Sequence, residues 1–145
     1  MKLTGHCYCG ALRYEAGGAP LFKGQCHCRE CQYISGGMPA VVMGMKEGEF
    51  RYTQGKPKGF RRADLPNPVT REFCPECGTH VVTRAPAMPG AVMLKVGTLD
   101  DPSAFGKPQL IQAGKMLQRV GNRASCYPAR ESIDELPVLQ KGIRP

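Results

Sequence analysis

The chain has 145 residues, a formal net charge of +8 and eight cysteines, with 18 glycines, 13 prolines and no tryptophan. This length fits one domain, and the shortage of large apolar side chains limits the core, so bound metal would help to hold the fold. The basic charge favours anionic partners, either a small molecule with a carboxylate or a phosphate backbone. The charge falls to about +5 if seven cysteines bind two zinc ions as thiolates.

The amino-terminal segment and the length of the apolar runs indicate where in the cell the protein is found. Met1–His6 contains no apolar leader-like region, and no apolar run approaches the roughly 18 residues of a membrane span. We therefore expect no membrane association and a cytoplasmic protein. Because thiols stay reduced in that compartment, the cysteines are expected to bind metal rather than to form disulfides.

Short strand signals, each ended by glycine or proline, follow one another along the chain. Residues 11–16 alternate apolar and polar side chains, and residues 38–45 read as a buried strand with residues 49–53 as its return. Three further strand signals follow at residues 69–73, 81–83 and 91–97. Many short strands with closely spaced turns predict a mainly β domain of antiparallel sheets.

Helix signals are weak by comparison. One turn is expected after Cys28 and one after Ser103. No internal repeat or linker divides the chain. We therefore expect a single zinc-binding domain over residues 1–145, in which the pattern weakens from about residue 113 into surface turns or a docked tail.

Residues 73–80 contain a Cys-Pro-x-Cys-Gly turn, whose commonest use is half of a zinc site. Cys74 and Cys77 can wrap a tight turn and direct both sulfurs at one point. Pro75 fixes the backbone φ within this turn, and Gly78 accepts the positive φ that ends it.

A tetrahedral zinc needs four ligands, and Cys7 and Cys9 supply the missing pair best. Four sulfurs leave no position for a substrate, so we interpret this site as structural. A thioredoxin-type disulfide between Cys74 and Cys77 is one alternative, but it belongs in a βαβ setting that this chain does not offer. Buried reduced thiols are another, although they do not explain two pairs.

A second cluster places Cys26, Cys28 and Cys31 within six residues. Three protein ligands and an open position are the arrangement of catalytic zinc, which can bind a substrate thiol, polarise a carbonyl or activate water. Two alternatives remain: His27 as a fourth ligand, or Cys126 closing the site from the tail and making it structural.

Other groups have less specific interpretations. His6 and His80 flank the first site and are expected to lie beside its ligands or on the surface. The basic run at residues 56–62 reads as a solvated loop, and its one phenylalanine makes a weak nucleic-acid patch. The methionines within residues 38–45 are expected in the core, although such residues also line pockets and interfaces.

Four motifs in order carry a family resemblance. Residues 5–10 match a G-x-C-x-C-G opening, and residues 26–36 match a C-H-C-x-x-C segment followed by Ser-Gly. Residues 71–79 match an R-x-F-C-x-x-C-G-T block, and residues 96–102 match a G-T-L-D-D-P block. Over about residues 5 to 108 the chain thus resembles the glutathione-dependent formaldehyde-activating enzyme family, which includes the centromere protein V group.

The resemblance implies several small coiled antiparallel sheets, of the β-tent type, around a structural zinc. The ligands it implies for that zinc are Cys7, Cys9, Cys74 and Cys77. A second, catalytic zinc is implied at Cys26, Cys28 and Cys31. The family's activity is the addition of the glutathione thiol to formaldehyde, giving S-hydroxymethylglutathione, which is a carbon–sulfur lyase reaction in reverse.

The chain departs from the family near its carboxyl end. Family members usually carry a P-x-x-H-I-like strand and then a tryptophan. Here residues 108–112 lack the histidine, and the chain has no tryptophan. If that end shapes the pocket, the substrate differs from glutathione plus formaldehyde.

The leading hypothesis is a carbon–sulfur lyase-type enzyme in which zinc at Cys26, Cys28 and Cys31 holds a small thiol as a nucleophile toward an aldehyde. The acid/base candidates are His27, Glu30 and His80.

Two other hypotheses come from different classes. The first is a non-catalytic, zinc-stabilised binding module that contacts a protein partner or nucleic acid. Its basic contacts would be Lys56, Lys58, Arg61 and Arg62. The second is a protein whose open zinc senses or stores metal or thiol. The oligomeric state does not follow from the sequence.

Overall fold

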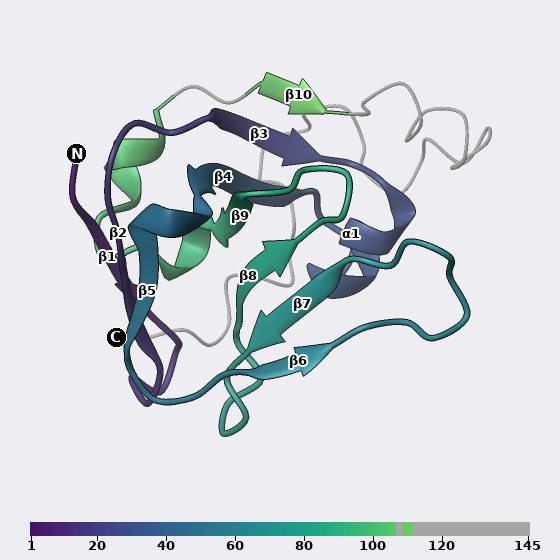
Figure 1. Cartoon of the computed structure of the whole chain (residues 1–145), viewed down its shortest axis with the longest axis horizontal. Helices are drawn as coiled ribbons and strands as arrows, with labels where there is room; N and C mark the ends of the chain where they lie inside the picture. Colours follow the sequence, from purple (N-terminus) through teal and green to yellow (C-terminus); the bar gives the residue numbers. More distant parts are fainter. Residues whose placement is uncertain (107–108, 112–145) are drawn as a thin grey trace, which may run out of the picture.

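A computed structural model describes residues 1–106 and 109–111 and is mainly β, which confirms the predicted fold class. Strands β1 (Leu3–His6), β2 (Arg13–Ala16) and β5 (Phe50–Gln54) form a three-stranded antiparallel sheet in the order β1-β2-β5. This small sheet stands at one side of the molecule (Figure 1). The predicted strands at residues 11–16 and 49–53 correspond to β2 and β5.

A seven-stranded sheet makes up the rest of the described β structure. Its strands lie in the order β10 (Gln109–Ile111), β3 (Phe22–Cys26), β4 (Ala40–Lys46), β9 (Ala91–Lys95), β8 (His80–Arg84), β7 (Thr70–Phe73) and β6 (Lys58–Phe60). Neighbouring strands are antiparallel except β10 and β3, which are parallel. Strands β3, β4, β9, β8 and β7 therefore form the continuous middle of the sheet (Figure 1).

The hydrophobic core joins the two sheets. Tyr14 of β2 is 1% exposed, and Met43, Met45 and Leu94 of the larger sheet are fully buried in the same cluster. The core position predicted for the methionines is thus confirmed for Met43 and Met45. Met38 differs, because it precedes β4 and is 54% exposed.

Short helices cap the ends of strands. Helix α1 (Arg29–Ile34) begins directly after Cys28 and contains Cys31, and η3 (Pro102–Phe105) begins after Asp101, whose carboxylate accepts a hydrogen bond of 2.9 Å from the Ser103 amide. The helical turn predicted after Cys28 is confirmed, and the turn predicted after Ser103 is present but begins already at Pro102. Two further 3-10 turns are η1 (Glu47–Glu49) and η2 (Val96–Thr98). Strand β9 accordingly ends at Lys95, before the end of the predicted strand at residue 97.

Four strands lie outside the sequence predictions, namely β1, β3, β6 and β10. β1 and β3 have few apolar residues, so pairing with neighbouring strands, rather than their own pattern, makes them strands. β6 lies inside residues 56–62, where we predicted a solvated loop: Lys58, Gly59 and Phe60 are exposed as expected, but they pair with β7 as an edge strand.

The predicted tail from about residue 113, including Cys126, lies outside the described residues. Within the described part, no helix is long and apolar enough to cross a membrane.

Candidate metal centres and an adjoining pocket

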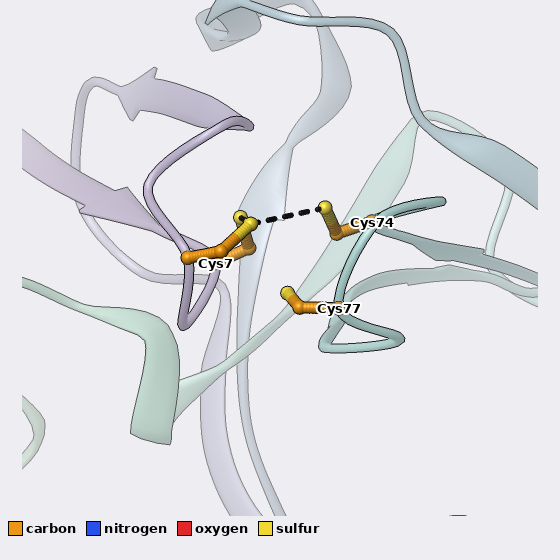
Figure 2. A group of neighbouring side chains, drawn as sticks. Cys7, Cys74 and Cys77 are labelled. Atoms are coloured by element: carbon orange, nitrogen blue, oxygen red, sulfur yellow. Dashed lines mark hydrogen bonds between the residues drawn. The ribbon is translucent and has the colours of Figure 1, made fainter.

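Cys7, Cys9, Cys74 and Cys77 come together as the sequence predicted. Their sulfurs all lie within 4.8 Å of one another, with 3.5 Å between Cys7 and Cys9 and 3.8 Å between Cys9 and Cys74. Four sulfurs at about 2.3 Å around one zinc ion are separated by about 3.8 Å, so the donor set fits this metal. In Figure 2, Cys7 on the amino-terminal loop faces Cys74 and Cys77 on the loop between β7 and β8.

Two similar turns present these sulfurs. Gly10 and Gly78 end the turns with φ of 76° and 72°, and their amides donate to the carbonyl oxygens of Cys7 and Cys74 at 2.9 Å. Only glycine adopts this conformation without strain, which confirms the role predicted for Gly78. The Leu12 amide donates to the Cys7 sulfur at 3.2 Å and so favours its thiolate form.

A hydrogen bond joins the two turns directly. The Tyr8 amide donates to the Thr79 hydroxyl at 3.1 Å, and that hydroxyl also lies 3.1 Å from the Cys77 sulfur. His6 lies beside the cluster, where its Nδ1 donates to the Cys7 carbonyl at 2.7 Å. In the part of the chain that the structure describes, neither His6 nor His80 joins a metal-capable group.

Cys26, Cys28 and Cys31 form the second group, also with sulfurs within 4.8 Å of one another. Cys26 ends β3, Cys28 immediately precedes α1, and Cys31 lies within that helix. A hydrogen bond from the Cys31 thiol lowers the pKa of Cys26 to about 5, while the same contact raises the pKa of Cys31. The cluster alone therefore keeps at least one proton, and three thiolates there need the charge of a cation.

The two groups differ in their surroundings. All three cysteines of the second group line a cavity of about 440 Å³. Of the first group, Cys74 lines a smaller cavity of about 110 Å³. The second group is thus the one beside space for a small molecule.

The wall of the 440 Å³ cavity is largely apolar. Its seven apolar residues are Phe22, Ile34, Val42, Val69, Ala85, Met88 and Met93. The remaining lining residues, besides the cysteines, are Glu30, Arg71, Thr83 and Lys95. The cavity lies between α1 and one face of the seven-stranded sheet, since α1 supplies Glu30 and Cys31 and the strands supply most of the rest.

The charged groups of the wall have different partners. Nη2 of Arg71 donates to Oε2 of Glu30 at 2.7 Å, although the Arg71 side chain is 7% exposed and that of Glu30 is 43% exposed. Burial lowers the pKa of Lys95, and the nearby cysteine thiolates oppose this shift. Among the described residues, no carboxylate pairs with Lys95.

Sequence reasoning identified the cysteines but did not single out Arg71, Thr83 or Lys95. A signal existed for two of them: Arg71 begins the motif before Cys74, and Lys95 interrupts an otherwise apolar strand. Of the three acid/base candidates, Glu30 lines the cavity, whereas His27 and His80 do not.

Over the residues that the structure describes, fold and site together define a mainly β, cysteine-rich protein with two groups that could each hold a metal ion, one beside a cavity of small-molecule size. The family model described as "Glutathione-dependent formaldehyde-activating enzyme" matches residues 2–112. The chain belongs to this family, which confirms the resemblance seen in its motifs.

A crystal structure of a Rhodobacter sphaeroides protein has a similar fold. It superposes with a TM-score of 0.60 at 18% sequence identity, over 74% of this chain and 99% of the other. No curated protein matches the chain. Family membership implies small-molecule substrates of the glutathione and formaldehyde kind.

Proposed function

We propose that the chain adds a small thiol to formaldehyde or another small aldehyde, a reaction of the S-(hydroxymethyl)glutathione synthase type. The observation that carries this proposal is the cavity beside Cys26, Cys28 and Cys31. In the reaction a carbon–sulfur bond forms, the carbonyl π bond breaks, and the thiol proton ends on the carbonyl oxygen. The product is a hydroxymethyl thioether or its homologue.

Both cysteine groups fit zinc, and we assign one zinc to each. The group at Cys7, Cys9, Cys74 and Cys77 uses four ligands and holds the fold, because it joins segments about 65 residues apart. The group at Cys26, Cys28 and Cys31 supplies three ligands. Zinc bound there would favour the thiolate form of a thiol substrate at neutral pH.

Residues of the chain contribute orientation and proton transfer. The apolar wall excludes water from the reacting atoms. Glu30 lies on the same helix as Cys31 and lines the cavity, so its carboxylate is the group best placed to move the thiol proton toward the product oxygen. Arg71 fixes that carboxylate through its 2.7 Å contact.

This assignment includes two further proposals. We place residues 1–145 in one zinc-binding domain, since the family match runs from residue 2 to residue 112 without a break. We also place the protein in the cytoplasm, where glutathione is abundant and thiols stay reduced.

The first test is zinc per chain by elemental analysis, in the wild type and in Cys28→Ala, each with a folding check by circular dichroism. Two zinc ions in the wild type and one in a folded variant support the two roles. One zinc ion in both proteins, or an unfolded variant, contradicts them.

The second test is the rate of thiol addition. Thiols add to formaldehyde without help, so the two-zinc protein must exceed the uncatalysed rate and Cys28→Ala must not. If the wild type gives no acceleration with any thiol, the proposed activity is wrong.

A binding module remains the second candidate, supported by one observation. β6 is an exposed edge strand that carries Lys58, with Lys56 and Arg61 beside it, although Arg62 pairs with Asp64. This function predicts salt-sensitive DNA binding that weakens in Lys58→Ala. Absence of a mobility shift at low salt excludes the DNA form of this function.

A further inference from the structure

We infer that the cavity beside Cys26, Cys28 and Cys31 contains an anion subsite made by Arg71, Thr83 and Lys95. The thiol that this cavity binds best therefore carries a carboxylate group on an otherwise apolar carbon chain. The part of this inference that concerns a thiol rests on the proposed function, whereas the anion subsite itself does not.

Strand register places the three residues together. Arg71 of β7 lies directly opposite Thr83 of β8, and Thr83 lies opposite Met93 of β9. Lys95 follows Met93 by two residues on the same strand, so both side chains point to the same face of the sheet. Arg71 and Thr83 are a direct pair, whose side chains lie about 5 Å apart, and Lys95 lies diagonal to Thr83 at about 7–8 Å, a gap that its long side chain can span.

Thr83 provides the observation that points to a ligand. It is 8% exposed and lines the cavity, and among the described residues its Oγ1 has no hydrogen-bond partner. Buried hydroxyl groups are usually hydrogen-bonded, so an orphaned hydroxyl in a cavity wall indicates a partner within the cavity. A bound carboxylate oxygen can accept a hydrogen bond from the Thr83 hydroxyl.

The two cations supply the charge for an anion. Arg71 is 6% exposed and uses Nη2 for Glu30, and the rest of its guanidinium fork has no side-chain acceptor in the described part of the chain. Lys95 lines the same cavity and has no carboxylate partner among the described residues. Charge-assisted hydrogen bonds from both groups to one carboxylate would be stronger than neutral ones.

The rest of the wall limits what else the ligand carries. Phe22, Val42, Met88 and Met93 offer no polar partner, and Glu30, the one carboxylate of the lining, is already paired with Arg71. An ammonium group on the ligand would therefore be desolvated without compensation. This favours a simple mercaptocarboxylate over glutathione, which carries an ammonium group and two amides.

Binding of thiol-free probes tests the subsite without any reaction. The probes are hexanoate and its neutral analogue hexanamide, titrated into the zinc-loaded full chain by calorimetry. We expect hexanoate to bind at least about tenfold more tightly than hexanamide, as charge-assisted contacts are stronger than neutral ones. Equal affinities, or no binding of either probe, would overturn the subsite.

Three variants test which residues cause the preference for hexanoate over hexanamide. Lys95→Met should lower hexanoate affinity several-fold and leave hexanamide unchanged. The isosteric Thr83→Val removes a donor that the carboxylate and the amide carbonyl can both use, so it should weaken the binding of both probes. Lys46→Met is the matched control, because Lys46 is exposed at the far end of β4. Zinc is measured in every variant: a Lys95→Met protein that loses zinc but keeps the hexanoate preference would show that Lys95 only balances the thiolate charge.

Reaction rates then separate the two proposals. Formaldehyde is offered with 6-mercaptohexanoate, with 6-mercaptohexanamide and with glutathione, and we expect the carboxylate thiol to have the highest kcat/KM. Hexanoate binding without acceleration of any thiol would support the subsite and contradict the proposed function. Acceleration without a preference for the carboxylate thiol would support the function and contradict this substrate class.

Discussion

Gly5 lies where the fold leaves no room for a side chain. A Cβ atom at this position would overlap the Tyr14 hydroxyl and the backbone carbonyl oxygen of Thr98. Tyr14 is 1% exposed, and its hydroxyl lies 2.9 Å from the Thr98 hydroxyl, so neither obstacle can move freely. The close approach of β1 to the core therefore depends on glycine.

Gly5→Ala is expected to destabilise the protein by about 1–3 kcal/mol, the usual cost of overpacking a core. Urea unfolding, followed by the midpoint at constant slope, measures this change. Gly48→Ala is the matched control, because a Cβ at Gly48 meets nothing within 4 Å. Equal midpoints for the two variants would contradict the packing argument.

His80 makes folding depend on pH. Burial, together with the charges of Lys95 and Arg71, lowers the pKa of His80 to about 4 from an ordinary value of 6.5. Between pH 6.5 and pH 4 the His80 side chain is therefore protonated in the unfolded chain but largely neutral in the folded one. The free energy of unfolding consequently decreases as the pH falls through this range.

His80→Gln should remove this part of the pH dependence. Because His80 is only half-buried, solvent screening reduces the effect, and we expect the wild type to lose about 1 kcal/mol more than the variant between pH 7.5 and pH 5. Thermal or urea unfolding at both pH values measures the difference. Protonation of the cysteines acts on both proteins alike, so identical losses would refute the role of His80.

At the scale of elements, Glu72 links the two sheets. Its carboxylate, on β7, accepts hydrogen bonds from the Tyr52 hydroxyl of β5 at 2.8 Å and from Nε of Arg84 on β8 at 2.6 Å. The Glu72 side chain is 14% exposed. Burial and the hydrogen bond to Glu72 both raise the pKa of Tyr52, which therefore remains a donor at neutral pH.

Glu72→Ala is expected to cost about 2–3 kcal/mol, because it leaves the part-buried Tyr52 hydroxyl without its acceptor and leaves Arg84 with Glu47 as its remaining carboxylate partner. Tyr52→Phe removes one hydrogen bond and should cost about 1 kcal/mol. Denaturant unfolding of both variants checks this order. If Tyr52→Phe proves the more costly change, the carboxylate is not the centre of the network.

The register of strand pairing also decides which side chains meet at the site. The spacing of cysteines within each turn is local, so Cys74 and Cys77 were predictable from four residues of sequence. Arg71 and Thr83 face each other only because β7 and β8 pair in one register, and a shift by one residue would turn one of them to the other face. No local pattern encodes that choice.

At the scale of the whole molecule, the two metal-capable groups have different consequences for folding. The first group closes a long loop, because it joins Cys9 to Cys74. The second group joins three cysteines within six residues, so ligation there closes only a very short loop. Ligation at the first group therefore removes much more conformational freedom from the unfolded chain.

Chelation should release metal in two phases. We expect the metal beside the open cavity to leave first with the circular dichroism spectrum unchanged, and the second metal to leave together with the loss of folded structure. Cys74→Ser should unfold or lose most stability, whereas Cys28→Ala should remain folded. Unfolding that accompanies the first metal released would contradict this division.

The fold class, most strands of the described part, both helical turns and the membership of the two cysteine groups could be predicted from the amino-acid sequence. These features depend on local pattern, turn chemistry and ligand spacing, which act over a few residues. Only the tertiary structure placed Arg71, Thr83 and Lys95 around one cavity beside Cys26, Cys28 and Cys31. Their meeting depends on the pairing of strands distant in sequence, where burial of the whole sheet face selects the register.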